Sequence, residues 1–200
     1  MDAVGFFFAP PETDPSAHRT PEGYHSVLYL LRRELQDCLF GTVVPEAQVR
    51  AHDAPEYRRY RLFATAMVLV SGIDLLGQFL APLSSVEDRF AGFVTTYLYP
   101  GDAAAATTLY GVRNALLHTF GLHDATKQLA LTIQPPAHDP AGRRAVSQAG
   151  DSWVVELGQL YDDFVRAVGA YQRDLADQEP AHQAMRQSFM TRCSPSAAAS

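Results

Sequence analysis

The stretch "TTLYGVRNALLHTFGLH", Thr107 to His123, combines a buried-helix pattern with residue types that could do chemistry. It carries Arg113, Asn114 and His118 among leucine, valine and tyrosine. On a helix, Asn114 and His118 are four residues apart and share a face, whereas Arg113 lies about 140° around the axis from His118. Because the arginine stem is long, its guanidinium could still bend back toward the imidazole.

These three residue types suit the chemistry of a phosphate group. The predicted helix ends just after His118, and a helix C-terminus favours the protonated imidazole, which is suited to moving protons near neutral pH. An adjacent arginine can hold a phosphate and stabilise developing negative charge. The plainer interpretation is that the three residues are a solvated helix end or its cap, and spacing alone favours it.

Four further residues are candidates for substrate binding. Tyr110 would stack on a base or simply pack. Arg58 and Arg59, in "YRRYRLF", would form a phosphate-binding rim or a solvated basic turn. His123 would face the same cleft as His118 or lie in a surface loop. For the two arginines and His123 the surface alternative is the simpler one, and for Tyr110 the sequence does not separate the two alternatives.

Composition limits the classes of function. Of the 200 residues, 47% are hydrophobic and 19% are charged, which is typical of one globular domain. The formal net charge of −6 provides no overall attraction for nucleic acid or anionic membranes, so any RNA binding must be local. The sequence has no phosphate-binding glycine loop, no serine-nucleophile motif and no clustered metal ligands, so we expect no metal and no cofactor.

The cellular location is predicted from what the sequence lacks. Cys38 and Cys193 are far apart and form neither a disulfide framework nor a zinc motif. The start, "MDAVGFFFAP", has no basic region and is not typical of a signal peptide. No apolar run approaches the ~20 residues that a membrane span needs. We therefore expect a cytoplasmic protein with no membrane partner.

Hydrophobic periodicity predicts about five helices. Residues 1–20 are expected to be a mobile arm, with Phe6 to Phe8 able to dock. The helices are expected at 21–41 after a Thr20 cap, from Asp53 or Ala54 to 81, at 84–99 with a Ser84 capping box, at 103–120 after an Asp102 cap, and at 158–175. The second is apolar on nearly every side, so it should be central, with small residues Ser71, Gly72 and Gly77 allowing close approach. Its Asp74 is expected to be partly exposed or paired.

The segment before the last helix has strand composition. "KQLALTIQ" and "SWVVEL", residues 127–134 and 152–157, predict a short antiparallel hairpin on the side of the bundle. Residues 179–200 are expected to be a flexible tail. The predicted fold is therefore all-α, a bundle of about five helices over residues 21–178 with a β-hairpin inserted before the last helix.

The motif "RNALLH" resembles the Arg-x4-His signature of the HEPN superfamily. The likeness extends to "RNALLHTFGL", to the position of the motif late on a bundle helix, and to the hairpin and final helix that follow. It covers about residues 22–178. In that family the arginine is often followed by asparagine, so the resemblance implies catalytic roles for Arg113, Asn114 and His118.

The resemblance implies a metal-independent endoribonuclease, a toxin or antiphage effector, with its active site composed across a homodimer. The RNA 2′-hydroxyl would attack the neighbouring phosphorus and leave a 2′,3′-cyclic phosphate, with His118 moving the proton and Arg113 neutralising charge. Such toxins often pair with a nucleotidyltransferase-like antitoxin.

Two alternatives stay open. The acidic charge favours a non-catalytic HEPN-like module for nucleotide binding or dimerisation, and a plain helical interaction protein is the third interpretation. An Arg113 locked in an ion pair with Asp74 would favour the non-catalytic module.

Overall fold

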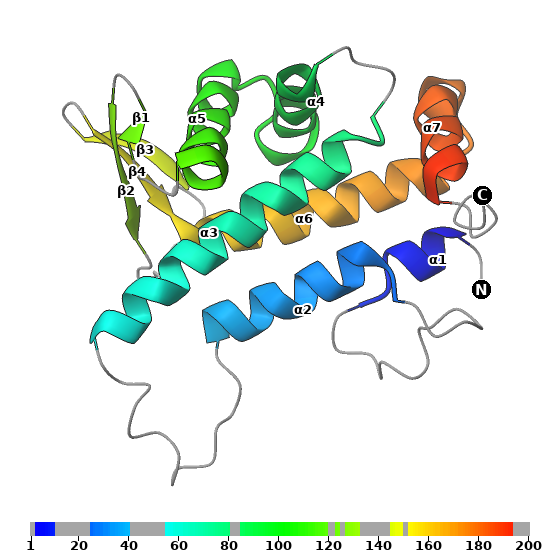
Figure 1. The fold of residues 1–200 in the computed structure, drawn as a ribbon. Helices are drawn as coiled ribbons and strands as arrows, with labels where there is room; N and C mark the ends of the chain where they lie inside the picture. The colour runs from blue at the N-terminus through cyan, green and yellow to red at the C-terminus, as the bar shows by residue number, and fades with distance from the viewer. Residues whose placement is uncertain are drawn as a thin grey trace, which may run out of the picture.

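The computed structural model describes residues 3–10, 25–40, 55–80, 85–119, 123–124, 127–132, 145–149 and 152–193. These residues form mainly helices, with a small sheet at one side (Figure 1). In chain order the helices are α1 (Ala3–Phe7), α2 (Val27–Phe40), α3 (Pro55–Gly77), α4 (Val86–Phe93), the π-helix η3 (Val94–Leu98), α5 (Ala103–Thr119), α6 (Leu157–Ala176), the 3-10 turn η5 (Pro180–His182) and α7 (Gln183–Cys193). The mainly helical prediction is confirmed.

Helix α3 is the centre of the bundle, as its apolar sequence predicts. It crosses the middle of the molecule and contacts α2, α4, α5 and α6 (Figure 1). Its fully buried side chains include Leu69, Val70, Ile73 and Leu76. A helix with neighbours on several sides needs apolar residues all around its axis, which explains why α3 is apolar on nearly every side from Phe63 onward.

Two glycines let the neighbouring helices approach α3 closely, as predicted. A Cβ added at Gly72 would lie 2.7 Å from Cζ of Phe164 on α6. A Cβ added at Gly77 would lie 2.6 Å from the backbone oxygen of Arg89 on α4. Both distances are too short for real carbon atoms, so the absent side chains determine how closely α4 and α6 pack.

The chain bends between α4 and α5, and the π-helix η3 lies between these two helices. Ser85 caps α4 by accepting a hydrogen bond from the Asp88 amide at 3.0 Å. The predicted capping box at Ser84 is therefore off by one residue. After α4 the helix widens into η3, and Gly101, with φ of 76°, turns the chain. Asp102 then caps α5 as predicted, since its Oδ1 accepts from the Ala105 amide at 2.9 Å.

The first and last long helices of the predicted bundle differ in how well their limits were predicted. The α2 cap is Ser26, whose Oγ accepts from the Tyr29 amide at 3.0 Å, while the predicted start at Thr20 lies outside the described residues. Helix α6 matches the predicted fifth helix and begins where Glu156 accepts from the amides of Gly158 and Gln159. Its apolar stripe is fully buried, including Leu160, Phe164, Val168 and Tyr171.

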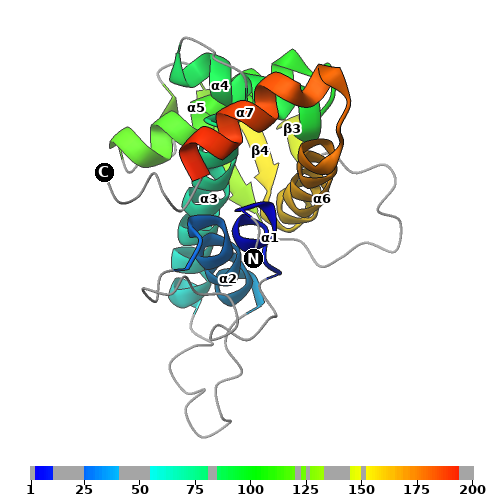
Figure 2. The same cartoon turned by 90° about the vertical axis from the view of Figure 1, so that its right-hand side faces the viewer.

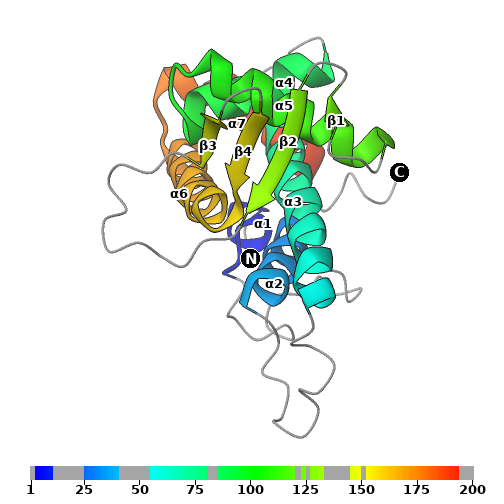
Figure 3. The same cartoon turned by 90° about the vertical axis from the view of Figure 1, so that its left-hand side faces the viewer.

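The sheet has four strands in the order β1-β2-β4-β3, namely β1 (His123–Asp124), β2 (Lys127–Thr132), β4 (Ser152–Glu156) and β3 (Val146–Ala149). Figure 3 shows it between α3 and α6, and β2 contacts α3 while β4 contacts α6. The two predicted strands are present and paired, but β2 and β4 run parallel, so the predicted antiparallel hairpin is wrong. The antiparallel partner of β4 is β3.

The missed strand β3 explains the error. Ala149 pairs with Ser152, so β3 and β4 are joined by Gly150 and Asp151 alone. A two-residue Gly-Asp connection is typical of a hairpin, and the sequence interpretation overlooked it. With β3 on one edge of β4, the earlier strand β2 takes the other edge and runs parallel.

The described parts of both chain ends contribute to the core, which agrees with the expectation that Phe6 to Phe8 can dock. Residues 11–20 of the predicted arm and 194–200 of the predicted tail lie outside the described residues. Phe7 and Phe8 from the N-terminal end are buried, as are Met185 and Phe189 of α7. The Phe7 ring lies edge-on to Phe79 at 5.3 Å and to Phe189 at 5.2 Å. Figure 2 faces α7 where it crosses the bundle. Aromatic side chains contribute a large buried area, which explains why these short helices dock.

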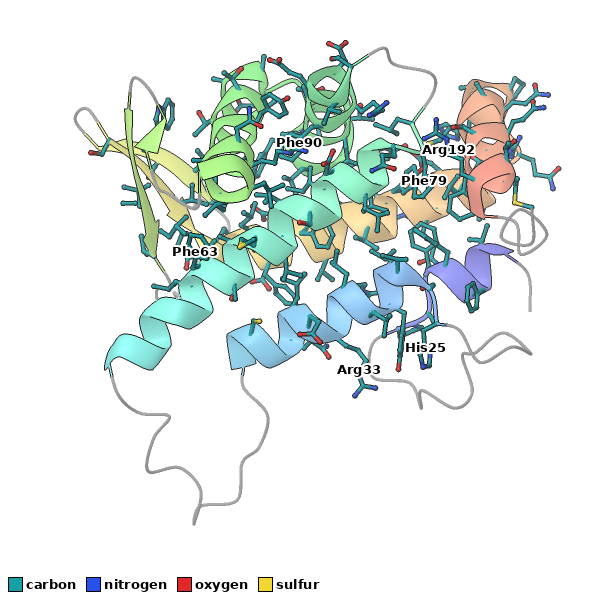
Figure 4. The ribbon with its side chains drawn as sticks, viewed as in Figure 1. His25, Arg33, Phe63, Phe79, Phe90 and Arg192 are labelled. Carbon is teal, nitrogen blue, oxygen red and sulfur yellow. The ribbon has the colours of Figure 1, made fainter. Side chains whose placement is uncertain are left out.

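Helix α7 is also held by a polar contact. Arg192 donates from Nη1 to the backbone oxygen of Gln78 at 2.8 Å, just after the end of α3. Figure 4 shows Arg192 and Phe79 together where the two helices meet. The charge at the C-terminal end of α3 complements the helix dipole.

Candidate functional site

The predicted site residues lie on α5 and beside it, and the structure describes them to different depths. Tyr110, Arg113 and Asn114 are described with their side chains. His118 lies in the last turn of α5 and His123 in β1, but their side chains are outside the described part. Arg58 and Arg59 lie in the first turns of α3, and their side chains are likewise outside it.

Arg113 is held in place by an ion pair between helices. Its Nη2 donates to Oδ2 of Asp74 on α3 at 3.0 Å. The side chains are largely buried, with 14% of Arg113 and 17% of Asp74 exposed. Water screens such a pair weakly, and separating it would leave a charge in a poorly solvated place. The expectation that Asp74 is a paired carboxylate is confirmed.

Two neighbours on α5 fix the orientation of the guanidinium. Nη1 of Arg113 donates to Oδ1 of Asn114 at 3.0 Å. Cζ of Arg113 lies 5.9 Å from the centre of the Tyr110 ring, one turn earlier on the helix. The Tyr110 ring itself rests against Phe90 of α4, with 5.6 Å between ring centres. Tyr110 therefore packs against Phe90, and its ring lies beside the guanidinium of Arg113.

The Arg113 guanidinium lies over the ring one turn earlier on the helix. Side chains on an α-helix lean toward its N-terminus, and Arg113 follows this rule by leaning over Tyr110. The structure thus brings together Arg113, Asn114 and Tyr110. Because the side chain of His118 is outside the described part, its proximity to the guanidinium stays a prediction.

Asp74 is only half satisfied. Its Oδ2 binds Arg113, but its Oδ1 is buried and accepts no hydrogen bond from the described residues. A buried carboxylate oxygen without a donor is costly and needs an explanation, such as a bound water or a ligand donor. The arrangement can therefore accept a hydrogen bond at Asp74, and Arg113 neutralises the carboxylate.

Sequence analysis missed two tyrosine–aspartate pairs that join η3 and its end to α6. Tyr99 donates to Oδ2 of Asp163 at 2.7 Å, and Tyr97 donates to Oδ2 of Asp174 at 3.0 Å. Burial, and then the adjacent aspartate, raise the pKa of each tyrosine above its usual range. One signal was visible, because Asp163 falls within the apolar stripe of α6, three residues after Leu160.

The described part of the chain holds neither a membrane-spanning helix nor a clustered metal site. None of its helices is long and apolar enough to cross a membrane. No group of three or more His, Cys, Asp or Glu side chains there is placed to hold a metal ion.

Comparison with protein-family models, curated proteins and solved structures found no match.

Proposed function

We propose that this protein is a HEPN-like helical module that is not catalytic in its resting form and that associates with a second copy through α5. The observation behind the proposal is the Arg113–Asp74 ion pair. A phosphate that takes Nη2 of Arg113 would displace Asp74 and leave that carboxylate largely buried without its partner. Leaving a largely buried charged group without its hydrogen-bond partner costs roughly 2 kcal/mol or more, which opposes phosphate binding.

The outer side of α5 supports association with a second copy. From Ala103 to Leu117 the helix has one permanently charged residue, Arg113, and that residue is paired with Asp74. Its more exposed positions are small or uncharged, namely Ala103, Ala104, Thr107, Gly111 and Asn114. A helix that faces water normally carries charged residues on that side, as α6 does with Asp162, Arg166 and Arg173. An uncharged outer side is typical of a helix that another protein covers.

Two matched threonines test the association. Thr107 on α5 and Thr96 on η3 are both exposed. Sedimentation equilibrium should show a dimer for the wild type and for Thr96→Arg, but a monomer for Thr107→Arg, because an arginine would be buried in the interface. A monomeric wild type, or equal behaviour of the two variants, would contradict the proposal.

A metal-independent endoribonuclease is the second candidate. It is favoured by the direct contact of Arg113 with Asn114 at 3.0 Å and by the position of His118 on the same helix. In this proposal a second copy or RNA itself opens the pair with Asp74, and Arg113 then binds the scissile phosphate. His118 transfers the proton as the 2′-hydroxyl attacks phosphorus and the 5′-oxygen leaves. A toxin or antiphage role with a nucleotidyltransferase-like antitoxin belongs to this candidate.

RNA cleavage in the presence of EDTA separates the two candidates. A nuclease should lose on the order of 10²–10⁴ in rate in His118→Ala and in Arg113→Ala. Asp74→Asn should raise its rate, since the amide holds the guanidinium less strongly than the carboxylate does. Arg166→Ala, which removes the arginine of an arginine–aspartate pair on α6, is the matched control and should leave the cleavage rate unchanged. Absence of cleavage by the wild type and by Asp74→Asn supports the non-catalytic module.

A further inference from the structure

A pocket lies at the bend between α4 and α5, far along α5 from Arg113. It has a volume of about 200 Å³ and opens to solvent. It is formed where η3 ends, where the chain turns into α5 and where β3 begins; its lining residues are Leu98, Tyr99, Pro100, Asp102, Ala105 and Val146. We call it the elbow pocket.

The size of the elbow pocket limits what it can hold. Sites for drug-sized molecules and cofactors usually measure about 300–1,000 Å³. A pocket of about 200 Å³ therefore suits a group of a few heavy atoms, such as the head of a small molecule. Four of its six lining residues are apolar, so the group that fits should present carbon to the walls.

One carboxylate and one aromatic ring give the pocket its polar character. Asp102 is the charged residue of the lining, and its Oδ1 is fixed by the Ala105 amide at 2.9 Å. Tyr99 is another lining residue, and its hydroxyl donates to Asp163 at 2.7 Å. A carboxylate beside an aromatic ring attracts a cation, by charge and through the negative face of the ring.

The titration of nearby groups agrees with a negative local field. Burial chiefly raises the pKa of Tyr99, and the charges of Asp163 and Asp102 raise it further, while Arg166 acts in the opposite direction. Burial and then the charge of Asp163 also raise the pKa of Asp162, the preceding residue on α6. The charges of Asp163 and Asp102 thus add a negative potential at Tyr99, a lining residue of the pocket.

We propose that the elbow pocket binds a compact organic ammonium group, with its carbon atoms against Leu98, Ala105 and Val146 and its charge against Asp102 and the Tyr99 ring. The proposal concerns a different surface from the α5 face and does not depend on the proposed function. A methylated ammonium suits the pocket better than a hydrated metal ion because apolar side chains form most of its wall.

A pair of isosteric probes tests the charge preference. Choline carries a trimethylammonium group, and 3,3-dimethylbutan-1-ol has the same shape without the charge. In amide NMR spectra of the full chain, choline should shift the signals of Asp102, Ala105 and Val146, and the neutral probe should bind about tenfold more weakly, a difference of about 1.4 kcal/mol. Equal binding of the two probes, shifts confined to other surfaces, or no shift with choline would overturn the proposal.

Two aspartate variants show whether the charge of Asp102 is responsible for the binding of choline. Asp102→Asn removes the charge and keeps a residue that caps helices well, so α5 should stay folded. Its affinity for choline should fall about tenfold. Asp88→Asn, which changes an exposed aspartate in the first turn of α4, should bind choline like the wild type. Equal affinity of the two variants for choline would mean that the shifts are a nonspecific effect of added salt, and it would contradict the proposal.

Discussion

Asp74 and Asp163 are both carboxylates within the helical core, and they are satisfied very differently. Asp163 is 3% exposed and both of its oxygens are occupied, Oδ2 by Tyr99 and Oδ1 by Gln159 at 2.8 Å and by Arg166. Asp74 is 17% exposed, binds Arg113 through Oδ2, and has an Oδ1 that no described residue serves. The more deeply buried acid is thus the better satisfied one.

The difference indicates two roles. A buried polar network in which every member has its partners makes the fold rigid and specific, and Asp163 holds the bend between η3 and α5 against α6. A half-satisfied carboxylate contributes less to stability and keeps an acceptor for something else. We therefore assign Asp163 to the fold and Asp74 to the candidate site, and this contrast can be tested by substitution.

Asp163→Ala should cause the largest loss of stability. It leaves the Tyr99 hydroxyl and the Gln159 amide without their acceptor in a buried region, and the expected cost is about 3 kcal/mol. Urea unfolding followed by circular dichroism measures it. A loss no greater than that of Asp74→Ala would show that complete satisfaction does not distinguish the two acids.

Asp74→Ala should cost less, about 2 kcal/mol, because it leaves one donor, Nη2 of Arg113, without this acceptor and also removes a buried oxygen that had no partner. A double-mutant cycle with Arg113→Ala isolates the pair, and we expect a coupling free energy of about 1 kcal/mol. No coupling would mean that the 3.0 Å contact adds nothing to stability, and the argument that Asp74 restrains Arg113 would fail with it.

The same two aspartates show how much of the candidate site could be predicted from the sequence. Asp74 stood out because it interrupts an almost continuous apolar helix, and a paired carboxylate was a correct prediction. Arg113 was considered as its partner, but the sequence could not decide the pairing, since Arg113 is 39 residues away and the contact depends on how α5 packs on α3. The direction of the Arg113 side chain could not be derived either, because it depends on its contacts with Asp74 and Tyr110. The predicted proximity of Arg113 and His118 stays a prediction, since the His118 side chain is outside the described residues.

The fold was predictable where periodicity is long and one-sided. Leu160 to Tyr171 repeat at helical spacing, and α6 follows that repeat. The sequence failed where a few large side chains determine the outcome. Phe189 anchors α7 in a segment whose composition is otherwise that of a polar tail, and β3, which has only four residues and one local signal in its Gly-Asp connection, is paired along β4. Short elements of this kind depend on tertiary contacts that local patterns do not contain.

Tyr99→Phe tests how much the phenol contributes to the satisfied network. The hydrogen bond to Asp163 should be worth about 1 kcal/mol at neutral pH. Because the folded state raises the pKa of Tyr99, its contribution is complete below the pKa of the unfolded tyrosine, near pH 10, and falls as pH rises beyond that value. In alkaline solution the free energy of unfolding should therefore fall less steeply with pH in Tyr99→Phe than in the wild type. Identical curves would contradict the raised pKa.

Arg166→Ala should produce the smallest effect and completes the contrast between the two acids. Arg166 pairs with Asp163, but its side chain is 71% exposed, so water screens the pair and can replace the guanidinium. We expect a loss of about 0.5 kcal/mol, well below that of Arg113→Ala, whose side chain is 14% exposed. Thermal unfolding of the two variants, in low and in high salt, measures the difference, and salt should weaken the Arg166 pair alone. If Arg166→Ala proves the more damaging, Asp163 depends on its cation rather than on Tyr99 and Gln159, and the two acids would then be alike in what holds them.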